Sequence, residues 1–159
     1  HALSGLNTYL SILIEHVIRN DGIVNKFAGD NIMGVWNAPQ TQENHALLAV
    51  KAAWEAQQAI MSRRHEDAFL PQVQFGIGIN TGDAIAGNMG SLWRTEYTVI
   101  GDAVNLASRI CGAAPGDEVW IGPETYKQVK QYVEVEELGP KSFKGKAEAV
   151  TVYRVTGIR

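Results

Sequence analysis

Two groups of polar residues have types and a spacing that suit chemistry on a charged substrate. Asn105 and Arg109 lie four residues apart in a segment with helical periodicity, so both would face one side of a helix and could reach one substrate together. Gly29 and Asp30 stand between two runs of β-favouring residues, where a hairpin turn would let the carboxylate meet a metal ion or a phosphate. The plainer alternatives are two solvent-facing helix residues and an aspartate that only forms a turn.

The helices that must position these residues follow from apolar side chains at intervals of three and four. The pattern predicts helices over residues 4–19, 44–61, 102–112 and 123–130. In the third of these, one face carries Ala103, Leu106, Ala107 and Ile110, and another carries Asp102, Asn105 and Arg109. The charged run over residues 63–67 follows the second helix and is expected to be a solvated end.

Alternating apolar residues and turn signals predict the strands. A hairpin is expected over residues 22–36, and a strand over residues 72–80 that turns at 81–83 into a second hairpin arm at 83–87. Gly76 and Gly78 leave one face of that strand bare, so another backbone or a helix should pack closely there. Further strands are expected at residues 97–100, 118–121, 132–136 and 150–155. The pattern suits an antiparallel-rich α+β fold with helices packed on one face of a sheet.

Composition limits the function classes open to the chain. A length of 159 residues suits one domain, and a net charge of −3 with a pI near 5.8 gives no electrostatic footprint for nucleic acid. The single cysteine, Cys111, cannot form a disulfide within the chain, which indicates a reducing compartment. Its apolar neighbours in the sequence indicate that it is a small buried residue. No segment has the length and apolar character of a membrane span. We therefore expect a cytoplasmic location, or the cytoplasmic side of a membrane-bound parent, without membrane contact by this chain itself.

Four blocks of sequence, in this order along the chain, resemble the catalytic domain of class III nucleotide cyclases, which are the adenylate and guanylate cyclases. They span residues 22–36, 76–82, 94–109 and 144–146, and the similarity extends from Leu6 to about Tyr153. The resemblance implies a single cyclase-like catalytic domain over residues 1–159. It also implies an α+β fold with a ferredoxin-like, antiparallel-rich sheet.

One block of that family has no counterpart in this sequence. Members usually begin with a strand that carries a first metal-binding aspartate in the pattern Phe-x-Asp-Ile-x-Gly-Phe-Thr, and nothing before Leu6 matches it. The chain also begins with His1 in place of an initiator methionine. We therefore expect an N-terminally truncated domain without its first, central strand, and an exposed ladder edge on a neighbouring strand.

The resemblance implies roles in converting ATP to cyclic AMP and pyrophosphate. Two divalent ions, Mg²⁺ or Mn²⁺, would be held by two aspartates, of which Asp30 matches the second. Asn105 would orient the ribose, Arg109 would neutralise the α-phosphate in the transition state, and Lys144 would bind the triphosphate tail. Because charge builds on the attacking, phosphoryl and leaving oxygens, such catalysis is mostly positioning and electrostatics. Taken alone, the Lys-Gly-Lys tripeptide that contains Lys144 is common and is weak evidence.

Lys26 and Thr98 match the two positions that read the base in this family. A lysine at the first position can donate to the adenine ring nitrogen, and the Thr98 hydroxyl can accept from the exocyclic amine. Guanine-specific members carry an acidic residue and a cysteine there, so the pair favours ATP. Thr98 departs from the aspartate of some adenylate cyclases, and it could equally be a strand residue that suits β-branching. A guanylate cyclase is therefore the alternative.

The resemblance also implies a homodimer. In the family, one chain gives the metal carboxylates and the other gives the substrate-binding residues, so two equivalent sites lie at the interface. With one of the two metal-binding aspartates unmatched, a second alternative is a cyclase-like module that binds a nucleotide or a partner without turnover. We expect residues 1–159 alone to be impaired as an enzyme.

Overall fold

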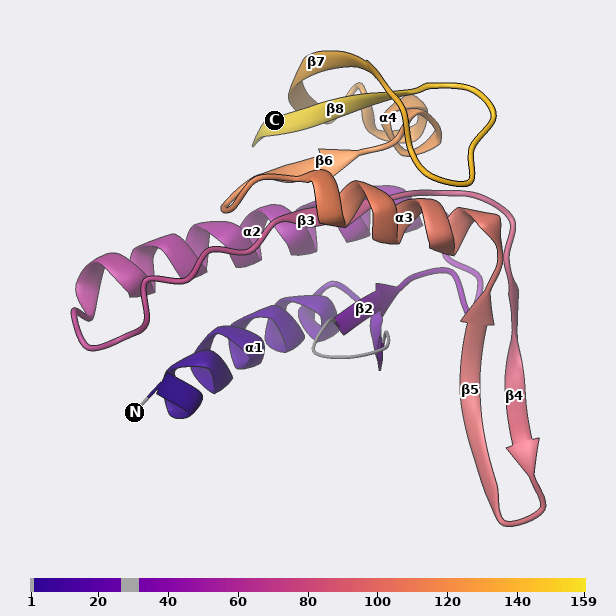
Figure 1. The fold of residues 1–159 in the computed structure, drawn as a ribbon, viewed down its shortest axis with the longest axis horizontal. Coiled ribbons are helices and arrows are strands. Elements are labelled where there is room, and N and C mark those ends of the chain that lie inside the picture. The colour runs from indigo at the N-terminus through magenta and orange to yellow at the C-terminus, as the bar shows by residue number, and fades with distance from the viewer. Residues whose placement is uncertain (1, 27–31) are drawn as a thin grey trace.

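The computed structural model describes residues 2–26 and 32–159 (Figure 1). Its elements are, in chain order, α1 (Ala2–Arg19), β1 (Ile23–Lys26), β2 (Ile32–Val35), α2 (His45–Glu66), β3 (Ile77–Ile79), β4 (Ile85–Ser91), β5 (Arg94–Ile100), α3 (Asp102–Ala113), β6 (Val119–Ile121), α4 (Pro123–Val129), β7 (Val133–Lys141) and β8 (Val150–Ile158). Within the described ranges, no helix is long and apolar enough to cross a membrane. Each helix expected from the sequence is present.

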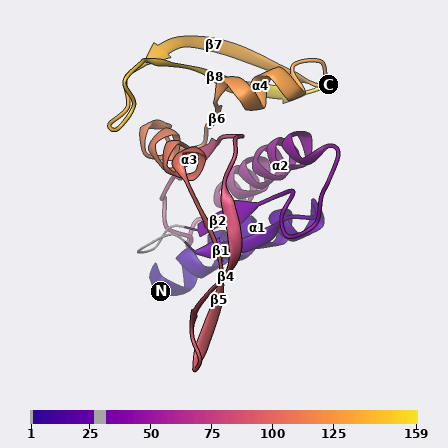
Figure 2. The same ribbon diagram turned by 90° about the vertical axis from the view of Figure 1, so that its right-hand side faces the viewer.

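Within residues 2–26 and 32–159, the strands form three separate sheets. In the order β3, β6, β8 and β7 they make a four-stranded sheet, in which β3 and β6 are parallel and the other pairs are antiparallel. Two antiparallel hairpins, β1 with β2 and β4 with β5, complete the set. The β4–β5 hairpin projects from the body on the side away from β7 and β8 (Figure 2). This arrangement confirms the predicted α+β class with an antiparallel-rich sheet.

Strand β6 lies between two helices and forms the centre of the core. Val119 and Ile121 pack on one face with Val50 of α2, whereas Trp120 between them packs on the other face with Leu106 of α3. Successive strand residues point to opposite faces of a sheet, so three apolar residues in a row need a cover on both sides. The expectation that helices pack on one face only was therefore wrong.

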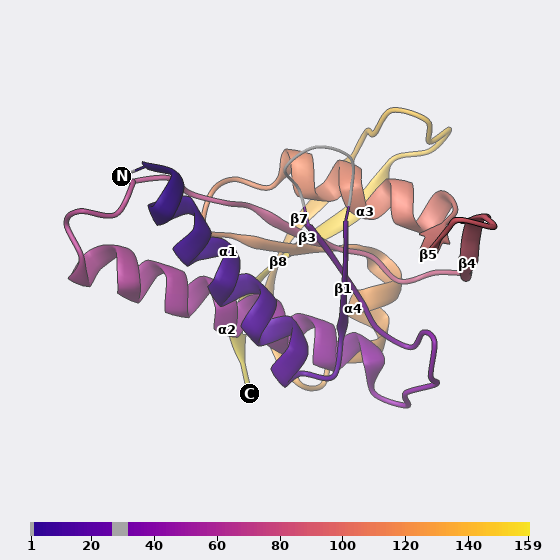
Figure 3. The ribbon, with the colours of Figure 1, turned by 90° about the horizontal axis from the view of Figure 1, so that it is seen from below.

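Helix α1 joins the body through α2. Figure 3 shows the two helices side by side. Tyr9 of α1 is fully buried in a cluster with Ile60 of α2 and Leu70, and its hydroxyl donates a hydrogen bond to the carbonyl of Pro71. The apolar stripe that predicted this helix therefore faces α2 and the loop that follows α2.

Helix α3 lies close to β3 because two glycines leave room for its backbone. A Cβ atom on Gly78 would stand closer than 3.0 Å to the backbone of Cys111, and one on Gly76 would stand closer than 3.0 Å to the backbone of Ala114. This confirms the prediction that another backbone or a helix packs on the bare face of the strand, and the partner is helix α3. The same contact sets the position of α3, and therefore of Asn105, over the sheet.

Gly78→Ala is expected to lower the free energy of unfolding by about 1–3 kcal/mol, because the new methyl group must push α3 away from β3. Urea denaturation followed by circular dichroism measures this change. Gly112→Ala is the matched control: Gly112 lies in α3, and no atom beyond its chain neighbours and the adjacent helix backbone lies within 4 Å of an added Cβ. Alanine there should stabilise the helix by about 0.5–1 kcal/mol. Equal effects at both glycines would contradict the close packing of α3 on β3.

Strand β3 is shorter than the predicted strand over residues 72–80. The carbonyl of Phe75 accepts a hydrogen bond from the side-chain amide of Gln57 (2.7 Å) and another from the N–H of Asp117 (2.9 Å). A side chain and a loop thus satisfy the backbone group that a ladder would use. The prediction was wrong for the first part of this segment, because these partners are distant in sequence.

The second hairpin also differs from its prediction. The arm expected at residues 83–87 was to fold back on the preceding strand, whereas β4 pairs with β5 along its whole length, from Ile85 opposite Ile100 to Ser91 opposite Arg94. A seven-residue partner that follows directly in the chain satisfies the ladder of β4 better than the three residues of β3 would.

The charged run over residues 63–67 is a solvated end only in part: Arg63, His65 and Glu66 are exposed, as expected, whereas Arg64 is not. Helix α2 continues to Glu66, and the side chain of Arg64 is only 10% exposed. Its guanidinium donates to the Asp117 carboxylate at 2.5 Å and to the carbonyl of Val73 at 3.2 Å. The expectation was wrong for Arg64, because a carboxylate far along the chain pairs with it and makes its burial tolerable.

Candidate functional site

The polar face of α3 carries two of the predicted site residues. The helix begins after Gly101, whose carbonyl accepts hydrogen bonds from the N–H groups of Val104 and Asn105, each at 3.1 Å. Leu106 is buried, whereas Asn105 and Arg109 are exposed. The helical period therefore places the amide and the guanidinium on the solvent side, as predicted.

A tight turn brings Lys144 to the same helix. The N–H of Lys146 donates to the carbonyl of Phe143 at 3.2 Å, and Gly145 has a φ of +87°. Residues 143–146 thus form a β-turn whose third residue adopts a left-handed conformation that favours glycine. The ring of Phe143 packs against the core cluster that contains Leu106 of α3. The anchored turn holds Lys144 beside α3.

Helix and turn enclose a hollow of about 70 Å³, which we call the α3 hollow. It is lined by Asp102, Asn105, Leu106, Arg109, Lys144, Gly145 and Lys146. Three of its side chains are cationic and one is a carboxylate, so positive charge is in excess where a phosphate could bind. The structure thus brings together three of the predicted site residues, which are Asn105, Arg109 and Lys144.

An ion pair at the rim of the α3 hollow was not predicted. The Lys146 ammonium lies 3.8 Å from the Asp102 carboxylate. Each residue lay in a segment that the sequence had singled out, because Lys146 is the second lysine of the Lys-Gly-Lys tripeptide and Asp102 lies on the helix face of Asn105. Without the fold, nothing indicated that these two residues meet.

The base-reading candidates lie on two neighbouring hairpins. Thr98 of β5 is half-buried opposite Gly87 of β4, and its hydroxyl is 3.4 Å from the carbonyl of Glu96. The side-chain amide of Asn25, next to Lys26, donates to the carbonyl of Tyr97, next to Thr98, at 3.1 Å. The backbones of Lys26 and Thr98 therefore lie near each other. The structure does not describe the Lys26 side chain, and Thr98 is not part of the α3 hollow lining.

The metal-binding candidate cannot be placed, because Asp30 lies outside the described residues. Within residues 2–26 and 32–159, no group of three or more histidine, cysteine, aspartate or glutamate side chains is arranged to hold a metal ion. The role of Asp30 stays a prediction.

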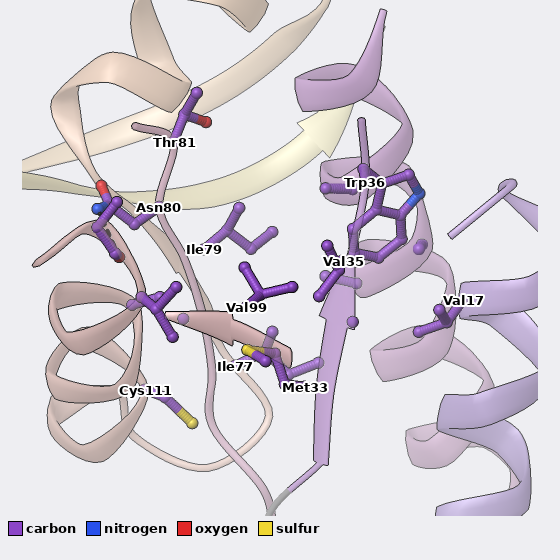
Figure 4. Close-up of a pocket in the computed structure, with 18 of the residues that line it drawn as sticks. Val17, Met33, Val35, Trp36, Ile77, Ile79, Asn80, Thr81, Val99 and Cys111 are labelled. Carbon is purple, nitrogen blue, oxygen red and sulfur yellow. Dashed lines mark hydrogen bonds between the residues drawn. The ribbon is translucent and has the colours of Figure 1, made fainter. Parts of the chain in front are cut away.

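A larger cavity of about 550 Å³ lies between β2 and β3 (Figure 4). Met33 and Val35 of β2 border it, as do Ile77 and Ile79 of β3. In the described part of the chain, no strand pairs with the edge of β3 that faces this cavity. Cys111 also borders it, and burial raises the pKa of its thiol, which therefore stays neutral at pH 7. The lining is suited to packing and not to nucleophilic chemistry.

Comparison with known proteins decides the family. The family model for the adenylate and guanylate cyclase catalytic domain matches residues 2–157. The chain belongs to this family. Adenylate cyclase 1 of Rhizobium meliloti (strain 1021) is 32% identical to this cyclase domain over 157 residues, which cover 96% of the chain. The domain spans 24% of the length of that relative.

Solved cyclase structures share the fold of this cyclase domain. The adenylyl cyclase CyaB of P. aeruginosa is 31% identical, with a TM-score of 0.86 over 99% of this chain and 83% of the other. The guanylate cyclase domain of RhGC from Catenaria anguillulae, solved in complex with GTP, is 27% identical, with a TM-score of 0.87 over 99% of this chain and 84% of the other. Because both kinds of cyclase match equally well, the likeness does not choose between ATP and GTP.

Proposed function

We propose that this cyclase domain converts ATP to cyclic AMP and pyrophosphate. The observation that carries the proposal is the α3 hollow, where Asn105 and Arg109 of a helix meet Lys144 of a distant loop. A hydrogen-bonding amide and two cations at one point suit a ribose that is linked to phosphates. Membership of the cyclase family supports the same reaction class.

Each of the three residues has a distinct task in the proposed reaction. The ribose 3′-hydroxyl loses its proton to solvent as its oxygen bonds to the α-phosphorus, and the bond from that phosphorus to the pyrophosphate oxygen breaks. Arg109 suits the α-phosphate, because a planar guanidinium can donate two parallel hydrogen bonds to it. Lys144 suits the phosphate tail as a compact charge on a flexible stem. Asn105 would hold the ribose, so that the attacking oxygen stays in line with the leaving group.

Metal ions enter the proposal only through Asp30. When bound, a pair of Mg²⁺ or Mn²⁺ ions would stabilise the charge on the attacking and leaving oxygens. The described residues alone make no metal cluster, so the tasks above are derived for Asn105, Arg109 and Lys144 without it. Asp30 is proposed as one ligand because of its Gly-Asp hairpin setting.

The size of the α3 hollow supports a site shared between two copies. Pockets that enclose a drug-sized ligand usually measure about 300–1,000 Å³, whereas the hollow of about 70 Å³ has room for a phosphate-sized group. The rest of a nucleotide therefore needs another surface. On the projecting β4–β5 hairpin, Leu92 is 99% exposed and Trp93 is 94% exposed. Such an apolar tip favours contact with a second copy, and we propose a homodimer.

ATP is proposed as the substrate because Lys26 and Thr98 belong to hairpins that are joined by the Asn25 hydrogen bond. A lysine and a hydroxyl at neighbouring positions can pair with the adenine ring nitrogen and its exocyclic amine. A guanylate cyclase is the second candidate, because the similar domain from Catenaria anguillulae was solved with GTP.

Lys26→Glu combined with Thr98→Cys is expected to shift the preference from ATP toward GTP by about tenfold or more, because the new carboxylate accepts from guanine and repels adenine. Rates of cyclic AMP formation from ATP and of cyclic GMP formation from GTP, measured side by side, test this. The protein measured is residues 1–159 preceded by a strand with the pattern Phe-x-Asp-Ile-x-Gly-Phe-Thr, which we call the strand-restored protein. Lys127→Glu with Thr95→Cys is the matched control, since it makes the same chemical changes at exposed positions. An unchanged ATP to GTP ratio in the first variant would show that these residues do not read the base.

A further inference from the structure

The ion pair between Lys146 and Asp102 joins the two elements that form the α3 hollow. Lys146 ends the turn that carries Lys144, and Asp102 is the first residue of α3. The Lys146 side chain is 35% exposed and the Asp102 side chain is 82% exposed, with 3.8 Å between their charged atoms. Neither residue has a task in the reaction proposed above.

The loop that carries Lys144 has few other anchors. It runs from residue 142 to residue 149, between the end of β7 and the start of β8, and its residues are exposed except for Phe143. Phe143 fixes the loop before Lys144 through its apolar contacts. The ion pair of Lys146 fixes the loop after it. Lys144 thus stands between two attachments, and its side chain is exposed and lines the α3 hollow.

We propose that Asp102 and Lys146 form a latch that positions Lys144 for the phosphate tail of the nucleotide. The latch acts through Lys144 by holding residues 143–146 on α3, so Asp102 and Lys146 are positioning residues. The proposal rests on the proposed function, because it assigns Lys144 to the phosphates. Without the latch, the loop must be ordered when the nucleotide binds, and part of the binding free energy is lost.

A latch and a direct phosphate contact predict opposite effects on nucleotide affinity when Asp102 is replaced. If Lys146 touched the phosphates itself, removal of the neighbouring carboxylate would take away repulsion and strengthen nucleotide binding. If the pair is a latch, loss of either partner weakens binding by a similar factor. Exposed ion pairs contribute little free energy, so we expect the dissociation constant of the nucleotide to rise by about two- to fivefold.

The test measures the dissociation constant of the fluorescent N-methylanthraniloyl derivative of ATP for residues 1–159. Asp102→Asn and Lys146→Met are each expected to raise it by about two- to fivefold, and the double variant should be no worse than either. The reversed pair, Asp102→Lys with Lys146→Asp, should restore most of the affinity. In a Lys144→Ala background, Asp102→Asn should have no further effect. Glu15→Gln, which breaks an exposed ion pair on α1, is the control and should change nothing.

Three results would overturn the latch. Tighter binding by Asp102→Asn would show a direct contact of Lys146 with the phosphates. If Lys144→Ala weakens binding while Asp102→Asn and Lys146→Met leave it unchanged, the proposed function stands and the latch alone is wrong. If neither Lys144→Ala nor Arg109→Ala weakens binding, the proposed function fails and the latch fails with it. Both latch residues are partly or largely exposed, so the fold is not at risk in these variants.

Discussion

Mixing Asp30→Ala chains with Arg109→Ala chains is expected to restore part of the cyclase activity that each variant lacks. If one copy supplies Asp30 and the other supplies Arg109, each mixed dimer contains one intact site and one site with both defects. Random pairing makes half of the dimers mixed, so the mixture should reach roughly a quarter of the unaltered activity. The measurement is cyclic AMP formation in the strand-restored protein. Differently tagged chains show that mixed dimers form.

The matched control for this mixture pairs two defects on the same helix. Asn105→Ala mixed with Arg109→Ala should recover nothing, because both residues come from α3 of one copy and every site of a mixed dimer lacks one of them. If mixed dimers form and the Asp30→Ala mixture also stays inactive, a site shared between copies is wrong. Recovery in both mixtures would contradict the joint role of Asn105 and Arg109.

Residues 1–159 alone are expected to make cyclic AMP about 100-fold more slowly than the strand-restored protein, in which a strand with the pattern Phe-x-Asp-Ile-x-Gly-Phe-Thr precedes them. One carboxylate, Asp30, should bind Mg²⁺ weakly, since such ions are held through one or two carboxylates together with phosphates and waters. In the described part of the chain, a cavity of about 550 Å³ also lies between β2, the strand that follows Asp30 in the sequence, and the edge of β3. Initial rates with Mg²⁺ or Mn²⁺ measure both proteins.

The control for this comparison changes one residue of the added strand. Replacing its aspartate by asparagine keeps the strand and removes the charge, so it separates support of the fold from metal binding. We expect this variant to be nearly as slow as residues 1–159 alone. Equal rates for residues 1–159 and the strand-restored protein would mean that the first carboxylate is dispensable. They would also mean that Asp30 is not one of two aspartates that bind the metal ions.

The helix of the candidate site was predictable because its information is local. Spacing of three and four put Leu106 and Ile110 on one face of α3 and Asn105 and Arg109 on another, and the structure confirms both faces. The close packing of α3 on Gly78 was predictable for the same reason, because a bare strand face needs a neighbour.

Contacts between distant residues were not predictable from periodicity. The place of Lys144 beside Arg109 followed only from the family resemblance, because a tripeptide carries no sign of where its loop folds. The ion pairs of Lys146 with Asp102 and of Arg64 with Asp117 join residues far apart in the chain. Such pairs decide which charged side chains are solvated. The order of charges along the sequence does not show which distant residues pair.

The most direct test of the proposed function identifies the products that the strand-restored protein forms from ATP. We predict cyclic AMP and pyrophosphate in equal amounts, and a loss of about 100-fold or more in rate for Arg109→Ala, because this guanidinium would act on charge that develops in the transition state. Arg63→Ala, at an exposed position of α2, is the control and should keep the full rate. No cyclic nucleotide from ATP, or an unchanged rate with Arg109→Ala, would contradict the assignment of the α3 hollow as the catalytic site of an adenylate cyclase.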